Sequence, residues 1–478
     1  MTDSSEKTPL INSDRVLQDA EEKEKSNDII KEEFSFSRIT RREKLLLLSM
    51  GLMNFFACTC FSLLAPFFPA EAARKGVSTT VTGFIFGVFE FVIFISSPIF
   101  GNYITRIGSK FMFSCGTFVT GTCAILFGVL DRCPDGIVYI VMCFCCRIVE
   151  ALGCSAYVTA LFAITASVFP DNVSTVFGAL ETFSGIGMMV GPAIGGALYT
   201  AGGFGLPFFV MGSVVILYGM FCLYLMPPVK DHHSKLSKPF YFLLKSPLAL
   251  VTGFSILVGA FSLGFMDPTL AQHLSKLNLN TWQIGLMFLI APGIYAFTAP
   301  LWGWITDSKG YVKTMIFIGN LLSVLAFLML GPTTLIPFFP FNIWFMIISL
   351  IILGLMVGCA LIPTFKGVLQ GALQIGMPEN MDTHGIVSGY FNSLFSLGAC
   401  LGPTVGGAFV DKFGFNWGST GVACLFLLAA FLTFFYGLQS SMCRKPLTYT
   451  VSQTDYLKIE GENSSVEIMT NGEAQNTV

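Results

Sequence analysis

Charged residues are scarce in this chain. They make up 12% of its 478 residues, whereas hydrophobic residues make up 53%. A soluble globular protein carries about 25% charged residues, so this composition excludes an ordinary soluble domain. The mean hydropathy of +0.71 indicates instead a protein that crosses a membrane many times. The net charge is −2, and the lack of a basic excess argues against a nucleic-acid partner.

The chain also lacks the short catalytic patterns G-x-S-x-G, H-E-x-x-H and G-K-[ST]. We therefore expect neither an enzyme nor a bound cofactor. The 14 cysteines lie mostly inside apolar runs, where a thiol behaves as a small hydrophobic group. Cys143 and Cys146 have C-x-x-C spacing without a second pair, so we expect no metal site.

Long apolar runs are abundant, each close to the ~20 residues that cross a bilayer as a helix. Twelve are predicted, near residues 45–69, 80–100, 111–130, 137–166, 173–199, 207–227, 247–270, 282–305, 312–331, 341–363, 384–410 and 417–438. The polar ends, 1–44 and 441–478, are predicted to be disordered. A polar loop, 228–246, separates two six-helix bundles, 45–227 and 247–440. The predicted fold class is an all-α membrane protein with twelve transmembrane helices.

Basic residues near the ends of the predicted helices give an orientation. If the N-terminus lies in the cytosol, fifteen of these residues fall on the cytosolic side and five on the other side. Both tails and the central loop are therefore expected to face the cytosol. The polar N-terminal region also leads us to expect no cleavable signal peptide.

The pattern G-x-x-x-G-P-x-x-G-G occurs twice inside apolar runs, offset by 398 − 187 = 211 residues. This repetition predicts that the two halves are duplicates. Glycines four apart share one face of a helix and let a neighbouring helix approach to backbone distance, and the proline removes one helical hydrogen bond and bends the helix. The positions concerned are Gly187, Gly191, Pro192 and Gly195 in the first copy and Gly398, Gly402, Pro403 and Gly406 in the second.

A second repeated element follows the second and eighth predicted helices. Its first copy contains Gly101, Arg106, Gly108 and Lys110, and its second contains Gly303, Asp307 and Gly310. A glycine stands seven residues after the first glycine in both copies. The element supports the same duplication.

Together these elements resemble the major facilitator superfamily. The first copy of the loop element matches the superfamily motif G-x-x-x-D-R-x-G-x-[RK], except that Thr105 replaces the acid, and the second copy matches in part. Arg147-Ile-Val-Glu150-Ala-Leu-Gly153 resembles the helix-4 antiporter motif R-x-x-Q-G-x-G, and the duplicated glycine–proline pattern resembles the antiporter motif of helix 5. The resemblance implies two pseudo-symmetric bundles, transport by alternating access, and gating or structural roles for the motif residues.

A finer resemblance is to the vesicular amine transporter family, most of all to its vesicular polyamine transporter branch. It rests on residues 65–76 (APFFPAEAARKG), 180–185 (LETFSG) and 267–270 (DPTL). Monoamine members have an Asp in the first helix where this chain offers Asn54, and a longer first lumenal loop. The resemblance implies a cation substrate: a polyamine such as spermidine or spermine, or a monoamine.

Ionisable groups inside membrane segments are costly and usually face a cavity or one another. Five fall inside predicted helices: Glu90, Arg147, Glu150, Glu181 and Asp267. Four acids against one base give the interior a negative balance, which attracts organic cations. Because burial favours the protonated form of a carboxylate, a proton and an ammonium group would compete for the same oxygens. We predict that these five residues serve substrate binding and proton coupling.

Each of these residues also has a structural interpretation. Arg147 and Glu150 are three apart on one helix face, so they could neutralise each other. Asp267 could be a helix-terminal residue at the membrane interface. Asn392 stands six residues before Gly398, as Glu181 stands before Gly187. We predict that Asn392, like Asn54, is a polar residue of the cavity, with a structural hydrogen bond as the alternative.

The two tails contain patterns that resemble sorting signals. Glu6, Leu10 and Ile11 fit an acidic dileucine signal, and Tyr456 and Ile459 fit a tyrosine signal. They favour a vesicular or endolysosomal membrane, with clathrin adaptors as partners, although the plasma membrane stays open.

The leading hypothesis is a proton-coupled antiporter that moves organic cations from the cytosol into acidic vesicles. One alternative is a facilitator of another solute without this coupling, in which the acids are structural. The other is a transporter-like sensor or scaffold that acts through its tails.

Overall fold

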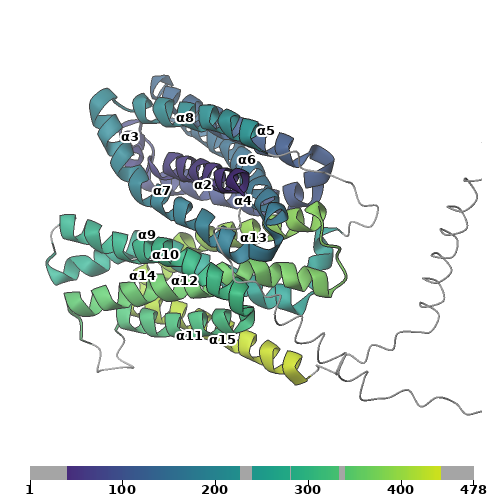
Figure 1. Ribbon diagram of the computed structural model, residues 1–478. Coiled ribbons are helices and arrows are strands. Elements are labelled where there is room, and N and C mark those ends of the chain that lie inside the picture. Colours follow the sequence, from purple (N-terminus) through teal and green to yellow (C-terminus); the bar gives the residue numbers. More distant parts are fainter. Residues whose placement is uncertain (1–39, 227–238, 280, 333–339, 443–478) are drawn as a thin grey trace, which may run out of the picture. The chain divides into compact units, whose positions relative to one another are not determined.

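The computed structural model describes residues 40–226, 239–279, 281–332 and 340–442. Within these ranges, twelve helical spans are long and apolar enough to cross a membrane, which confirms the predicted number. The first half contributes α2 (Arg41–Ser62), α4 (Thr79–Ile107), α5 (Ser109–Val129), α6 (Ile137–Val168), α7 (Val173–Gly202) and α8 (Gly205–Leu225) (Figure 1). The second contributes α9 (Pro247–Leu274), α10 (Thr281–Lys309), α11 (Val312–Leu330), α12 (Ile343–Gln374), α13 (Met381–Leu401) with its continuation α14 (Gly407–Phe413), and α15 (Phe415–Met442).

The described residues from Thr40 to Tyr436 form one compact unit, and Gly437–Met442 fall outside it. Within the first unit, α5 packs against α6 and α8, and α2 packs against α7 and α8. In the second half, α12 packs against α9, α10 and α11, and α9 also packs against α13. Each half is therefore a bundle of its own.

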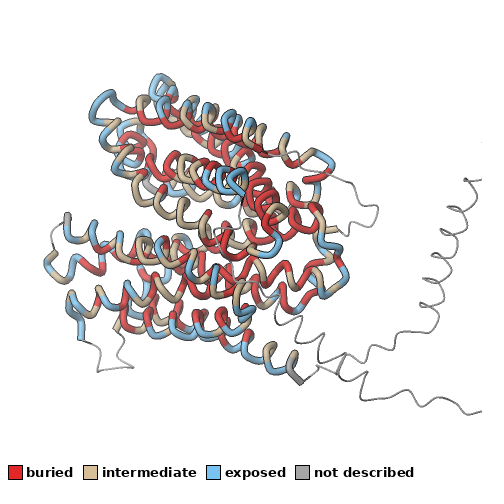
Figure 2. Tube along the Cα trace, viewed as in Figure 1, coloured by how far each residue is buried: buried red, intermediate tan, exposed pale blue. Residues whose placement is uncertain are grey.

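Buried and exposed residues alternate along these helices with the helical period, as Figure 2 shows. Large apolar side chains such as Phe84, Phe118 and Leu217 are exposed. Exposed apolar faces on backbone-satisfied helices are what a lipid environment requires. Buried residues face the neighbouring helices instead.

The first predicted run, 45–69, is shorter as a helix than expected. α2 ends at Ser62, and a turn leads into a short helix, α3 (Phe68–Arg74). The physical reason is the pair Pro66 and Pro69, which cannot donate the hydrogen bonds of a continuing helix. Pro69 instead stands in the first turn of α3, where the missing donor costs nothing.

In both copies of the loop element, the glycine seven residues after the first glycine has a positive φ. Gly108 has φ +93° between α4 and α5, and Gly310 has φ +68° between α10 and α11. Residues with a Cβ rarely adopt this conformation. This explains why glycine recurs seven residues into each copy.

The glycine–proline pattern brings helices to backbone distance, as predicted. A Cβ on Gly187 of α7 would overlap the carbonyl oxygen of Phe55 on α2, and a Cβ on Gly398 of α13 would overlap that of Leu257 on α9. The two helix pairs correspond under the duplication. The prolines differ, because α7 continues as an α-helix through Pro192, whereas Pro403 stands in a π-helical turn, Gly402–Gly406.

Candidate functional site: two helix seams between the halves

Two helix pairs join the halves. We call the packing of α4 on α13 the first seam and that of α7 on α10 the second seam. In the duplication α4 corresponds to α10, and α7 corresponds to α13, so the seams are equivalent. The candidate residues are best described by their positions along these seams.

The first seam is a row of polar contacts along one face of α4. Thr105 donates a hydrogen bond to Asp382, and Ser97 accepts one from Asn392 Nδ2 at 2.8 Å. The carbonyl of Phe94 accepts one from Ser393 at 2.8 Å. The α4 residues are spaced so that they share one helix face.

Glu90 comes next along α4, and Ser396 of α13 lies near its carboxylate. Ser396 is buried, and Glu90 is half-buried. Towards the start of α4, the described residues make one further hydrogen-bonding contact across the seam, between the Cys400 thiol and the carbonyl of Gly87 at 3.9 Å. Glu90 thus lies where the close contact of the first seam ends.

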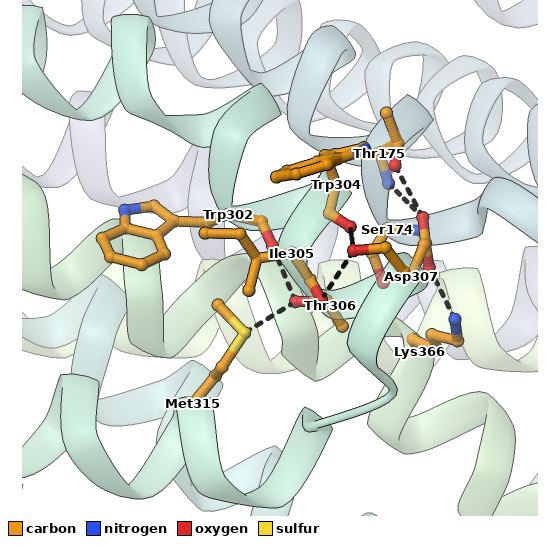
Figure 3. A network of polar contacts seen from close by, with 10 residues as sticks. Ser174, Thr175, Trp302, Trp304, Ile305, Thr306, Asp307, Met315 and Lys366 are labelled. Atoms are coloured by element: carbon orange, nitrogen blue, oxygen red, sulfur yellow. Dashed lines mark hydrogen bonds and ion pairs between the residues drawn. The ribbon is translucent and has the colours of Figure 1, made fainter. Parts of the chain in front are cut away.

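The second seam begins at Asp307, near the end of α10 (Figure 3). Its Oδ2 accepts hydrogen bonds from the Thr175 amide at 2.7 Å and the Thr175 hydroxyl at 2.8 Å. Its Oδ1 accepts one from Lys366 Nζ at 2.6 Å. Because Thr175 lies in the first turn of α7, Asp307 caps the positive end of that helix. One carboxylate therefore joins α7, α10 and α12.

Further along the second seam, Glu181 stands on α7 at the position that Asn392 occupies on α13 in the first seam. The Tyr295 hydroxyl of α10 donates to Glu181 Oε2 at 3.0 Å. The neighbouring Thr182 hydroxyl donates to the carbonyl of Ala296 at 2.6 Å. Residues beside both acids contact the same stretch of α2: Ser184 Oγ lies 3.0 Å from Cys58 Sγ, and the ring of Phe89 packs 4.9 Å from that of Phe61. Glu90 and Glu181 are both acids of the first half that face a hydroxyl of the second.

Arg147 and Glu150 form a buried ion pair on α6, with Arg147 Nη1 at 2.8 Å from Glu150 Oε2. The guanidinium also lies over the ring of Phe89, 4.2 Å from its centroid. The structural interpretation of mutual neutralisation agrees with this geometry. Arg147 Nε and Nη2, however, have no hydrogen-bond partner among the described residues. Phe89, the ring that the guanidinium covers, directly precedes Glu90 on α4.

The two asparagines differ in their surroundings. Asn54 is buried, donates to the carbonyl of Leu180 at 3.3 Å and accepts from the Tyr157 hydroxyl at 2.9 Å. These bonds tie α2 to α6 and α7 within the first half. Asn392 instead joins the halves through Ser97, which is itself 2.8 Å from Ser155. Asn392 therefore belongs to the first seam.

Asp267 stands apart from the other acids. It is exposed on α9, one residue before Pro268, and it makes no hydrogen bond to any of the described residues. The structure does not bring it together with Glu90 or Glu181.

The remaining loop-motif residues lie at one end of the seams. A Cβ on Gly101 would overlap the carbonyl of Gly385, and one on Gly303 would overlap that of Ser174. Arg106 is exposed and lies 5.4 Å from the Tyr103 ring centroid. Lys110 donates to the carbonyl of Met226 at 2.9 Å. We call this end, with Thr105 and Asp307, the contact end.

The sequence analysis did not identify a cluster of four phenylalanines near the contact end. Phe162 and Phe177 come from the first half, Phe365 and Phe391 from the second, and all are buried. Their ring centroids pack at 4.8 to 6.2 Å. Phe365 directly precedes Lys366, so this aromatic cluster adjoins the Asp307 network. With 49 phenylalanines in the chain, no sequence signal separates these four from the rest.

The sequence analysis also missed Ser396, Tyr295 and Lys366 as partners of the acids. The predicted sorting residues Glu6, Leu10, Ile11, Tyr456 and Ile459 lie outside the described residues.

Comparison with known proteins gives a consistent result. The sequence profile of the Major Facilitator Superfamily matches residues 50–374. The chain is 38% identical to human MFS-type transporter SLC18B1 over 421 residues, which cover 87% of this chain and 91% of that protein. It is 25% identical to the human synaptic vesicular amine transporter over 357 residues, which cover 74% of this chain and 66% of that protein.

The fold is also found among solved structures. The crystal structure of the human organic anion transporter MFSD10 matches with a TM-score of 0.64 and 18% sequence identity. The match covers 82% of this chain and 99% of the MFSD10 chain.

Proposed function

The chain belongs to the Major Facilitator Superfamily, and from that premise we propose that it is a proton-coupled antiporter that moves organic cations from the cytosol into acidic vesicles. The favoured substrates are polyamines such as spermidine and spermine, with monoamines as a related class. The more distant similarity to synaptic vesicular amine transporters supports an amine substrate. Transporters with this fold lie in a membrane and work by the movement of one bundle against the other.

One observation carries the proposal: each seam holds a carboxylate of the first half beside a hydroxyl of the second half. Glu181 accepts a hydrogen bond from Tyr295 at 3.0 Å, and Glu90 lies near Ser396. Two acids that flank a common region suit a substrate with separated ammonium groups, because each group needs its own counter-charge.

Coupling follows from competition for the same oxygens. A carboxylate in an apolar surrounding favours its protonated form until a cation arrives. An ammonium group that displaces the proton from Glu90 or Glu181 also displaces the hydroxyl of the opposite half. Cation binding, proton release and separation of the seam are thereby linked.

Arg147 and Glu150 support the coupling from α6. Their ion pair leaves two guanidinium donors without a partner among the described residues, and the guanidinium covers the ring of Phe89, the residue before Glu90. We assign Arg147 the role of setting the charge balance around Glu90. Asp267, exposed on α9, is proposed as an outer acid that meets the cation before or after the central pair.

Under this proposal the contact end and both tails face the cytosol, in agreement with the distribution of basic residues along the sequence. Clathrin adaptors would then have access to the two tail signals, and the protein would reside in a vesicular or endolysosomal membrane. Mutation of Leu10 and Ile11 to Ala should redistribute the protein to the plasma membrane in fluorescence microscopy. An unchanged distribution would contradict the role of that signal.

Transport in purified proteoliposomes tests the function itself. With an acid lumen, the protein should accumulate labelled spermidine, and a protonophore should abolish the accumulation. Accumulation that is indifferent to the protonophore, or that is absent for every polyamine and monoamine offered, would contradict the proposal.

A facilitator of another solute is the second candidate, because Glu181 already has a hydrogen-bond partner in Tyr295 and the acids could be structural. Glu90→Gln and Glu181→Gln separate the two functions. Each should abolish gradient-driven accumulation in an antiporter, whereas a facilitator should keep its flux. Transport by a variant without residues 1–39 and 443–478 would exclude a scaffold that acts through its tails.

A further inference from the structure

The turn of α7 that carries Glu181 packs against α2 as well as against α10. Asn54 of α2 donates from Nδ2 to the carbonyl of Leu180, the residue directly before Glu181, at 3.3 Å. On the next turn of both helices, Cys58 Sγ lies 3.0 Å from Ser184 Oγ. Helix α2 therefore contacts α7 on both sides of Glu181 along the chain.

Asn54 is itself oriented by α6. The Tyr157 hydroxyl donates to Asn54 Oδ1 at 2.9 Å, and both side chains are buried. An amide whose oxygen accepts this bond must turn its NH2 group towards Leu180. The reverse orientation would set the amide oxygen against the Leu180 carbonyl. We call the two hydrogen bonds, from Tyr157 to Asn54 and from Asn54 to Leu180, the amide relay.

The duplication of the halves shows what stands at the position of Asn54 in the other half. Phe55 of α2 and Leu257 of α9 are equivalent, because their carbonyls meet the first glycines of the two glycine–proline copies. The offset of 257 − 55 = 202 residues places Ile256 at the position of Asn54. Ile256 is fully buried and has no polar side-chain atom.

The position of Tyr157 is apolar in the other half as well. Its counterpart is Ala360 of α12, since the backbone nitrogen of each residue is the nearest atom to a Cβ added to a glycine of the preceding helix. The helix equivalent to α7 carries the uncharged Asn392 where α7 carries Glu181. The amide relay is therefore present in the half whose helix bears the acid, and both of its positions are apolar in the half whose helix does not.

The part of α7 that follows Glu181 has a low intrinsic preference for helix. Gly185, Gly187, Gly191 and Pro192 all lie within 192 − 181 = 11 residues of the acid. Glycine and proline favour the helix least. Contacts from the neighbouring helices must therefore fix the place of this turn.

We propose that Asn54, oriented by Tyr157, is a positioning residue for Glu181. It holds the preceding backbone carbonyl, so that the Glu181 carboxylate reaches the Tyr295 hydroxyl and the ammonium group of the substrate. Asn54 acts through the backbone of α7 and contacts neither the proton nor the cation in this role. The inference rests on the proposed function, because it assigns the residues that place one of its two acids.

Carbodiimide labelling of the full-length protein in detergent tests the positioning without a substrate. Dicyclohexylcarbodiimide modifies carboxyl groups in apolar surroundings, and mass spectrometry reads Glu181 and Glu90 separately. Asn54→Leu should raise the labelling rate of Glu181 by about two- to tenfold, the change expected when Tyr295 no longer holds the carboxylate through one hydrogen bond. The rate for Glu90 should stay the same. Tyr157→Phe, which removes a single hydroxyl, should act in the same direction.

Asn320→Leu is the matched control. Asn320 is also a buried membrane asparagine, and its Nδ2 donates to Ser255 Oγ at 2.9 Å within the second half. This variant should leave the labelling of Glu181 unchanged. Glu181 rates equal to that of the parent in both Asn54→Leu and Tyr157→Phe, in protein that elutes as the parent does in size-exclusion chromatography, would overturn the inference.

Binding of labelled spermidine separates this inference from the proposed function. Asn54→Leu should weaken binding by about two- to tenfold, because the acid is displaced. Tyr295→Phe should strengthen it, because the turn stays in place and a competing donor is lost. Unchanged binding by Asn54→Leu, when the parent binds spermidine, would overturn the inference. A parent that binds no organic cation, with Glu181 labelling altered as expected, would uphold the positioning and count against the proposed function.

Discussion

At the scale of single residues, the two seams differ in where their contact-end acid lies. In the second seam, Asp307 at the end of α10 caps the start of α7 and pairs with Lys366. In the first seam, Thr105 stands at the equivalent position, and the acid is Asp382 in the first turn of α13. A carboxylate in a first turn is favoured by the helix dipole. Asp382 Oδ2 has no hydrogen-bond partner among the described residues, so Thr105 supplies a donor that Asp382 needs.

Restoring the superfamily acid at this position should therefore harm the protein. Thr105→Asp would set a second carboxylate against the buried Asp382 and replace a donor with an acceptor, at a cost of several kcal/mol. We expect the variant to have a lower apparent Tm in detergent, while Thr105→Ser, which keeps the hydroxyl, stays near the parent. A Thr105→Asp protein as stable as the parent would show that this contact does not hold the seam.

The hydroxyl of Tyr295 competes with the substrate for Glu181 in this account. Tyr295→Phe removes the hydrogen bond and keeps the ring. The substrate-free state then loses about 0.5–1.5 kcal/mol of stabilisation that the cation would otherwise have to overcome. The KM for the transported cation should fall by about two- to tenfold. Tyr311→Phe, at an exposed tyrosine of the second half, is the control. A KM that stays the same or rises would mean that the cation does not displace Tyr295.

At the scale of helices, the account depends on how closely the glycine–proline elements pack. Gly402 of the second copy faces the carbonyl of Phe261 on α9, so a Cβ there has no room. Overpacking of this kind costs about 1–3 kcal/mol. The second copy of the glycine–proline element therefore allows its helix to pack closely against α9.

Gly402→Ala should lower the apparent Tm of the purified protein. Gly421→Ala, at an open helical glycine, should leave it unchanged or raise it slightly, because alanine favours helix and nothing obstructs the added methyl group. Equal effects of the two substitutions would contradict the packing explanation.

Helices and their duplication could be predicted because their signals are local. Apolar runs, repeated glycine patterns and prolines act within a few turns of chain, and the twelve predicted helices are confirmed. The end of α2 at Ser62 was missed, although Pro66 and Pro69 were its local signal.

Partners across the seams could not be predicted in the same way. Ser97 meets Asn392, which lies 295 residues away, and only the packed halves bring them together. The acids Glu90 and Glu181 could be singled out because ionisable groups are costly in a membrane. No sequence pattern identifies Ser396 and Tyr295 as their neighbours. Asn54 was also singled out as a polar residue in an apolar run. Its hydrogen-bond partners, however, lie within its own half.

At the scale of the whole molecule, different stretches of the two seams have different roles. Their contact ends hold the halves together through Asp307, Thr105 and the aromatic cluster, and their middles hold the acids. Equivalent contacts at one end of both seams, with the acids further along them, suit an alternating mechanism in which that end opens and closes.

The central claim is that Glu90 and Glu181 exchange a proton for a cationic substrate. The most direct test loads proteoliposomes with an acid buffer and a pH-sensitive dye, adds spermidine outside and records the lumenal pH. The account predicts that the cation causes alkalinisation with the parent protein and none with Glu90→Gln/Glu181→Gln, while the matched variant Glu379→Gln, at an exposed acid outside the seams, behaves as the parent. Alkalinisation that persists in the double variant would contradict it.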